Sequence, residues 1–142
     1  MAYKVLIVDD SLPMRSVVKK TIKASGFKVS QFFDASNGEE ALNILREEWL
    51  DLVLTDYNMP DMNGLELIEE MKKNEELKTI PVVMVTTEGS QQRVEEFMEK
   101  GVADYIKKPF TPEEVRNKLN RIMGETEDGE GSPDISDEDL DF

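Results

Sequence analysis

The order of hydrophobic and polar positions predicts strands and helices in regular alternation. Short apolar runs stop at polar residues, as buried strands do, and apolar residues recur at helical spacing between them. The expected strands cover residues 5–8, 29–33, 52–56, 82–85 and 103–106. Strands separated by helices pair in parallel through right-handed crossovers. The pattern therefore predicts an α/β fold in which helices cover both faces of a sheet.

Start and stop signals bound several of the expected helices. Ser11 can cap the first helix, and Gly26 can end it in a left-handed conformation. Thr111 and Glu114 form a capping box at the last helix, which Gly124 ends. In the first and fourth helices, the apolar positions expected to face the core are Met14, Val17, Val18, Ile22, Val94, Phe97 and Met98. The outer face of the first helix is expected to carry Arg15, Lys19, Lys20 and Lys23.

The second strand, residues 29–33, is more polar than the others. A parallel strand that is covered on both faces reads as a continuous apolar run. The weaker apolar character of this segment therefore predicts that it lies at an edge of the sheet.

The amino-acid composition excludes several kinds of functional site. The chain has 142 residues and contains no cysteine and no histidine, so disulfides, thiol nucleophiles and imidazole bases are excluded. Its 31 acidic and 17 basic residues give a net charge of -14, and nine of the acidic residues lie in the segment 125–142, which has no basic residue. Residues 1–124 therefore carry a net charge of -5. This balance argues against nonspecific binding to nucleic acid or to an anionic membrane.

Polar side chains follow the strands at the edge where an open α/β sheet binds ligands. They are Asp9, Asp10, Asp56, Thr86 and Lys108. Three carboxylates in a confined space need a counter-charge, and a set of oxygen ligands without imidazole or thiolate favours a hard cation. Magnesium fits best, because it accepts a few carboxylates and keeps waters that phosphate oxygens can replace.

Lys108 and Thr86 add a positive charge and a hydroxyl donor, which together suit an anion such as a phosphoryl group. A carboxylate can itself be the nucleophile that takes up such a group. Asp56 is the candidate, because it stands alone at the end of the central strand while Asp9 and Asp10 lie together as a metal pair.

At these positions the chain resembles the receiver domain of two-component response regulators. The matching residues are Asp9, Asp10, Asp56, the segment 59–64 (MPDMNG), Thr86 and the segment 108–110 (KPF), in the order and spacing of that family. The likeness covers residues 3–123 and indicates a single-domain receiver of the CheY type. It implies a flavodoxin-like, doubly wound five-stranded parallel sheet of order 2-1-3-4-5.

The resemblance also implies roles. Asp56 would accept a phosphoryl group from a sensor histidine kinase, and Lys108 would pair with that group. Asp10, Asp56 and the main-chain carbonyl of Asn58 would bind Mg2+, with Asp9 acting largely through water. The bond between Lys108 and Pro109 is expected to be cis.

Further positions would serve the switch. Thr86 would move toward the phosphoryl group and Tyr105 would turn inward, so that the surface of the last two helices and Tyr105 binds a partner protein. Asn58 and Glu88 fall where receivers set the rate of their own dephosphorylation. Thr87 stands where receivers most often carry a small residue, which bears on the lifetime of the phosphorylated state.

The predicted function is a phosphorylation-controlled signalling switch, most plausibly in chemotaxis or motility, with the flagellar motor switch and a phosphatase as further partners. It would catalyse only its own phosphorylation and dephosphorylation. One alternative is a phosphorelay intermediate. Another is a magnesium-dependent phosphatase with an aspartate nucleophile, although such enzymes carry a second Asp where this chain has Asn58 or Ser11. A flavodoxin would need a phosphate-binding loop where this chain has carboxylates.

Each residue alone also has an ordinary structural explanation. Asp9 and Asp10 could cap the first helix, Lys108 could be an exposed lysine, and Thr86 could bond its own backbone. Residues 1–124 are expected to form the receiver domain and 125–142 an acidic, disordered tail. That tail is either solvating, or a recognition motif for a partner or for the basic face of the first helix. No signal-peptide segment or membrane span is evident, so a cytoplasmic location is expected. The family resemblance implies a monomer.

Overall fold

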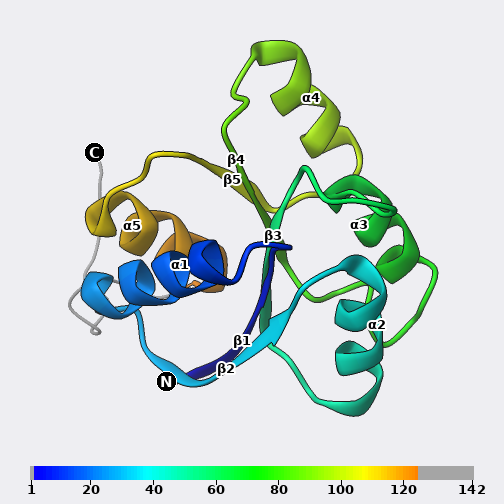
Figure 1. Ribbon diagram of the computed structural model, residues 1–142, viewed down its shortest axis with the longest axis horizontal. Coiled ribbons are helices and arrows are strands. Elements are labelled where there is room, and N and C mark those ends of the chain that lie inside the picture. Colours follow the sequence, from blue (N-terminus) through cyan, green and yellow to red (C-terminus); the bar gives the residue numbers. More distant parts are fainter. Residues whose placement is uncertain (1, 125–142) are drawn as a thin grey trace.

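The structure is a computed structural model that describes residues 2–124, so the expectations about the segment 125–142 lie outside the described residues. Strands and helices alternate along this part of the chain, each strand being followed by a helix (Figure 1). The strands are β1 (Tyr3–Val8), β2 (Val29–Ala35), β3 (Leu52–Asp56), β4 (Val82–Thr86) and β5 (Asp104–Lys107). The helices are α1 (Leu12–Ser25), α2 (Gly38–Glu47), α3 (Gly64–Lys72), α4 (Gln91–Glu99) and α5 (Pro112–Met123).

The strands form one parallel sheet in the order β2-β1-β3-β4-β5, which confirms the predicted fold and strand order. β2 lies at an edge, as its polar sequence predicted. The register places Val8 beside Thr55, Asp56 beside Val85 and Thr86 beside Lys107. The carboxyl ends of these strands therefore meet at one edge of the sheet.

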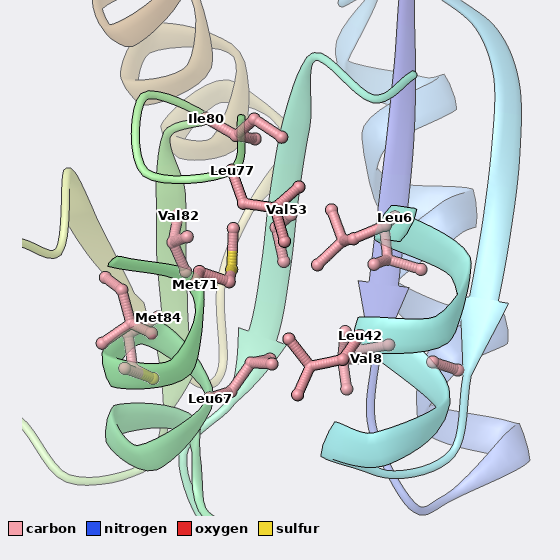
Figure 2. Close-up of a cluster of buried hydrophobic side chains, with 14 of the residues drawn as sticks. Leu6, Val8, Leu42, Val53, Leu67, Met71, Leu77, Ile80, Val82 and Met84 are labelled. Atoms are coloured by element: carbon pink, nitrogen blue, oxygen red, sulfur yellow. The ribbon is translucent and has the colours of Figure 1, made fainter. Parts of the chain in front are cut away.

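Alternate residues of each strand point to opposite faces, so two separate cores form. Val5 and Ile7 join the core under α1 and α5, whereas Leu6 and Val8 join the core under α2 and α3. Figure 1 shows the two sets of helices on opposite sides of the sheet. In Figure 2, side chains from α2 and α3 meet those of the central strands. The labelled members of that core are Leu6, Val8, Leu42, Val53, Leu67, Met71, Leu77, Ile80, Val82 and Met84.

The helix boundaries follow the predicted signals. The Ser11 side chain caps α1, Gly26 ends it at φ 85°, and the Thr111 and Glu114 capping box begins α5. Asn63 and Glu66 form a second capping box at α3, which was not anticipated from the sequence. Helix starts are predictable because a cap satisfies specific backbone N–H groups with a nearby side chain.

Two predicted core positions are wrong. Val17 and Met98 are 48% and 49% exposed, because each lies on the side of its helix that faces away from the sheet. Arg15 was expected on the outer face of α1, but its side chain is only 13% exposed and pairs with Asp34 of β2. Strand ends also differ by one or two residues, since β1 begins at Tyr3 and β2 continues to Ala35. Within residues 2–124, no helix is both long and apolar enough to cross a membrane.

Candidate functional site

The site lies at the carboxyl edge of the central strands. Asp9 follows β1, and Asp56 is the last residue of β3. Carboxylate oxygens of Asp9, Asp10 and Asp56 all lie within 4.8 Å of one another, an arrangement that could hold a metal ion. The predicted cluster is therefore formed, and its donor set of carboxylates alone suits a hard cation such as Mg2+.

Lys108 is the cation that faces this cluster. Its Nζ lies 3.4 Å from Oδ1 of Asp56 and 3.8 Å from Oδ2 of Asp9. The Lys108 side chain is 16% exposed and the Asp56 side chain 13% exposed, so both groups are largely screened from water. The bond from Lys108 to Pro109 is cis, as the family resemblance implied.

One lysine does not balance the three carboxylates. Burial raises the pKa of Asp9, and the negative charge of Asp56 adds to that effect. Burial likewise raises the pKa of Asp56, although the charge of Lys108 acts in the opposite direction. The site thus opposes the ionised form of both groups, and a bound cation would relieve this cost.

Two contacts hold Asp9 in place. The N–H of Ser11 donates to Oδ1 of Asp9 at 2.9 Å, while the Ser11 hydroxyl accepts from the N–H of Met14. The guanidinium of Arg15 donates to the carbonyl of Asp9 and to the carboxylate of Asp34. Ser11 rather than Asp9 or Asp10 is therefore the cap of α1, and the Asp9 carboxylate remains directed at the cluster.

The remaining predicted residues lie at the carboxyl ends of β3 and β4, on the same edge of the sheet as Asp56. Thr86 is buried at the end of β4, and its hydroxyl accepts from the N–H of Glu88 at 3.0 Å. Asn58 is exposed in the loop that follows β3, and Thr87 is exposed beyond β4. Among residues 2–124, no hydrogen bond or ion pair joins Thr86, Asn58 or Glu88 to Asp56.

Arg93 of α4 was not anticipated from the sequence. Its guanidinium lies 4.7 Å from the ring centre of Tyr57, the residue after Asp56, and pairs with Glu88 at 3.3 Å and with Glu96. The Tyr57 ring also packs against Phe97, with 5.4 Å between ring centres. These contacts join the loop after Asp56 to α4. Only the spacing of Arg93 and Glu96, three residues apart in a helix, could have indicated part of this network.

Tyr105 of β5 is partly exposed and contacts α5. Nζ of Lys118 lies 4.4 Å from the centre of its ring and donates to its main-chain carbonyl. Lys118 also lies 3.7 Å from the carboxylate of Asp104. Tyr105 thus lies in the edge strand β5, where it contacts α5.

Comparisons with known proteins agree with this geometry. Residues 5–120 match the family model of the response regulator receiver domain. The chain is 40% identical over 130 residues to the chemotaxis protein CheY homolog of Campylobacter jejuni, covering 91% of this chain and 98% of that protein. It is 38% identical over 122 residues to the chemotaxis protein CheY1 of Helicobacter pylori, covering 85% and 97%.

Solved structures show the same likeness. The chemotaxis protein CheY4 of Vibrio cholerae superimposes with a TM-score of 0.76 at 33% identity, covering 86% of this chain and 99% of that one. The match favours a phosphorylation-dependent signalling switch over a phosphatase or a flavodoxin, and the family implies contacts with a histidine kinase and with downstream targets. On its sequence, its strand order and its carboxylate cluster, the chain belongs to the response regulator receiver domain family.

Proposed function

We propose that Asp56 accepts a phosphoryl group from a phosphohistidine on a sensor kinase, and that this modification changes the affinity of the protein for a partner. The observation that carries the proposal is the placement of the Lys108 amine 3.4 Å from Asp56, beside a cluster of three carboxylates. This combination offers a nucleophile together with positive charge for a phosphoryl group.

The chemistry follows from these residues. A carboxylate oxygen of Asp56 attacks phosphorus in line with the leaving group, which departs with the electrons of the broken bond. Lys108 then pairs with a phosphoryl oxygen in place of the free Asp56 carboxylate. Asp9, Asp10, Asp56 and the carbonyl of Asn58 would hold Mg2+, which supplies positive charge to the phosphoryl oxygens when bound. The protein catalyses this step on its own Asp56, with the phosphodonor as the other reactant.

The switch would act through Thr86 and Tyr105. Phosphorylation adds negative charge and acceptor oxygens beside Thr86, whose hydroxyl would exchange its contact with the N–H of Glu88 for a phosphoryl oxygen. Movement of Thr86 would leave space that the partly exposed Tyr105 fills. The population would then shift toward an arrangement in which α4, β5 and α5 bind the partner.

Residues near the cluster would set the lifetime of the phosphorylated form. Asn58 and Glu88 would tune its hydrolysis, and the exposed Thr87 would narrow access of water to the phosphoryl group. The names of the relatives support a place in chemotaxis. A component of the flagellar motor switch would then be the downstream partner, and a phosphatase would be a further one.

The test is the intact mass of the protein after incubation with Mg2+ and acetyl phosphate. We expect one phosphoryl increment on the wild type, removable by hydroxylamine, and none on the Asp56→Asn variant. Wild type incubated with a chelator in place of Mg2+ should gain little. An equal increment on Asp56→Asn would exclude Asp56 as the acceptor, and rapid consumption of acetyl phosphate by Asp56→Asn would indicate a phosphatase.

A further inference from the structure

A basic face on the edge of the domain is unexpected in so acidic a chain. Residues 11–33 contain five basic side chains and no acidic one, although the chain as a whole has a net charge of -14. This segment forms α1, the turn at Gly26 and most of β2. Like charges gathered in one place repel each other, so an unneutralised cluster of this kind favours an acidic partner.

Two of the five basic residues already pair with a carboxylate. Arg15 and Lys19 both pair with Asp34, at 3.0 and 2.6 Å. Within residues 2–124, no carboxylate pairs with Lys20, Lys23 or Lys28. The available positive charge therefore lies at the end of α1 and the start of β2.

An open groove of about 540 Å³ lies at the same place. Lys23 and Lys28 contribute to its lining together with Phe27, Val29 and Phe32. Nζ of Lys23 lies 5.8 Å from the ring centre of Phe32, so charge and aromatic surface adjoin each other. Because β2 is an edge strand, the groove also borders backbone that has no strand on its outer side within residues 2–124. The groove thus suits a short segment that combines carboxylates with apolar side chains.

The C-terminal segment of this chain has that composition. Residues 125–142 contain nine acidic residues and no basic one, and Ile135, Leu140 and Phe142 stand among the carboxylates near its end. The segment begins where α5 ends at Gly124. Met123, at the end of α5, packs against the core cluster that contains Phe27 of the groove. The 18 residues could extend about 60 Å, which is ample to reach a groove on the same edge of a domain of this size.

We propose that the groove at the end of α1 and the start of β2 binds the acidic C-terminal segment of the same chain. Lys23 and Lys28 pair with its carboxylates, and Phe32 contacts its apolar residues. Covalent connection gives the segment a high effective concentration, so contacts too weak for a separate peptide still form. The groove lies at the amino end of β2, opposite the edge that carries Asp56, so this binding does not depend on phosphorylation.

The test uses full-length protein with one spin label. The chain has no cysteine, so Ala24→Cys, an exposed position beside Lys23, introduces a single site for a nitroxide. We expect the label to broaden the amide NMR signals of residues 135–142. This broadening should be lost in K23E/K28E and at about 1 M salt, where the screening length falls to about 3 Å. A label at Glu99→Cys on α4, which is exposed, should leave these signals sharp.

Matched variants separate the groove from charge in general. K73E/K78E makes the same change in net charge at exposed lysines elsewhere and should retain the broadening. When D137K/D139K is combined with K23E/K28E, the broadening should return, because the groove and the segment again carry opposite charges. Absence of broadening in the Ala24→Cys protein would overturn the proposal. An equal loss of broadening in K23E/K28E and K73E/K78E would also overturn it. Broadening of unlabelled isotope-enriched protein by labelled unenriched protein would also overturn it, because the segment would then bind a second copy.

Discussion

At the scale of single residues, the site is defined by charge that its own neighbours do not balance. Asp56 is 13% exposed in its side chain and faces one lysine and two further carboxylates. The raised pKa of Asp56 means that the folded protein favours its neutral form more than the unfolded chain does. This contribution lowers the free energy of unfolding at pH values above the folded pKa and disappears as the pH falls below the unfolded value.

Replacement of Asp56 by Asn should therefore stabilise the protein. In the absence of Mg2+ at pH 7, we expect Asp56→Asn to raise the free energy of unfolding by about 1 kcal/mol, measured by urea denaturation. Addition of Mg2+ should stabilise the wild type more than the variant, because the variant lacks one ligand. Asp61→Asn is the matched control, since Asp61 is exposed and Asn tolerates its φ of 70°. A loss of stability in Asp56→Asn without Mg2+ would contradict this electrostatic account.

The pKa of Asp34 shifts in the opposite direction to that of Asp56, so Asp34 has the opposite effect on stability. Burial acts to raise its pKa, but hydrogen bonds and charges from Lys19 and Arg15 outweigh burial and lower the pKa from its usual value near 3.8. The resulting stability is present at pH values above the unfolded pKa and is lost as the pH falls through the folded pKa. The two ion pairs thus contribute at neutral pH and not in strong acid.

We expect Asp34→Asn to lower the free energy of unfolding by about 1 kcal/mol at pH 7. The difference from wild type should shrink as the pH falls below about 3.8, where the unfolded chain takes up a proton on Asp34 while the native ion pairs still keep it charged, and should vanish once the pH is below the lowered pKa of the folded protein. Urea denaturation of both proteins from pH 7 to pH 3 measures it. A difference that stays constant over this range would show that the ion pairs are not its source.

At the scale of elements, close packing fixes how α3 meets the site. Gly64 is the first residue of α3, and a Cβ added there would lie 2.8 Å from the main-chain carbonyl oxygen of Asp56 and 2.5 Å from Sδ of Met84. The carbonyl belongs to the end of β3 and cannot rotate away as a side chain can. The absence of a side chain at Gly64 thus lets the helix start against the residue proposed as phosphoacceptor.

Gly64→Ala should accordingly destabilise the protein. The helix propensity of alanine favours the change by about 1 kcal/mol at most, whereas the overpacking costs about 1–3 kcal/mol. We expect a net loss of about 1 kcal/mol in the free energy of unfolding and slower phosphorylation by acetyl phosphate.

Gly38→Ala is the control for this change. Gly38 is the first residue of α2, and the atoms nearest to its added Cβ are Sδ and Cγ of Met62, which belong to a flexible side chain that can move away. Gly38→Ala should lower the free energy of unfolding less than Gly64→Ala does, when both variants are measured by thermal or urea denaturation. A greater cost at Gly38 would refute the role assigned to the Asp56 carbonyl.

The elements also show what the sequence could and could not predict. Caps such as Ser11 and Thr111 were predictable because their partners lie three residues away. The strands were predictable from apolar runs, but their ends were not, since the β1 residue Tyr3 pairs with β2 through contacts distant in sequence. Val17 and Met98 were assigned to the core from spacing alone, and apolar residues on an outer helix face follow nearly the same spacing.

At the scale of the whole molecule, one fold carries both the site and the surface that would read it. Family resemblance supplied the strand order and the cis bond at Pro109, neither of which composition or periodicity determines. The clustering of Asp9, Asp10 and Asp56 was predictable, because parallel strands end at one edge. The network of Arg93 with Tyr57 and Glu88 was not, because it depends on how α4 packs.

The proposed switch predicts a separation of phosphorylation from response. In Thr86→Ala, Asp56 should still be phosphorylated, but the amide NMR shifts of Tyr105 and of α4 and α5 should change less than in wild type. The shift changes should be smaller because alanine lacks the hydroxyl that would bind the phosphoryl group. Ser11→Ala is the control. It also removes a hydroxyl near the site, the one that caps α1, and it should retain the response. Identical shift changes in wild type and Thr86→Ala would exclude Thr86 as part of the switch.

The central claim is that the phosphoryl group resides on Asp56, and chemical mapping tests it most directly. Borohydride reduces an acyl phosphate to an alcohol, so an aspartyl phosphate becomes homoserine. The protein is phosphorylated with acetyl phosphate and Mg2+, reduced and digested, and its peptides are sequenced by mass spectrometry. We predict homoserine at position 56 alone. Homoserine at Asp9, Asp10 or Asp61 with an unchanged position 56 would contradict the account.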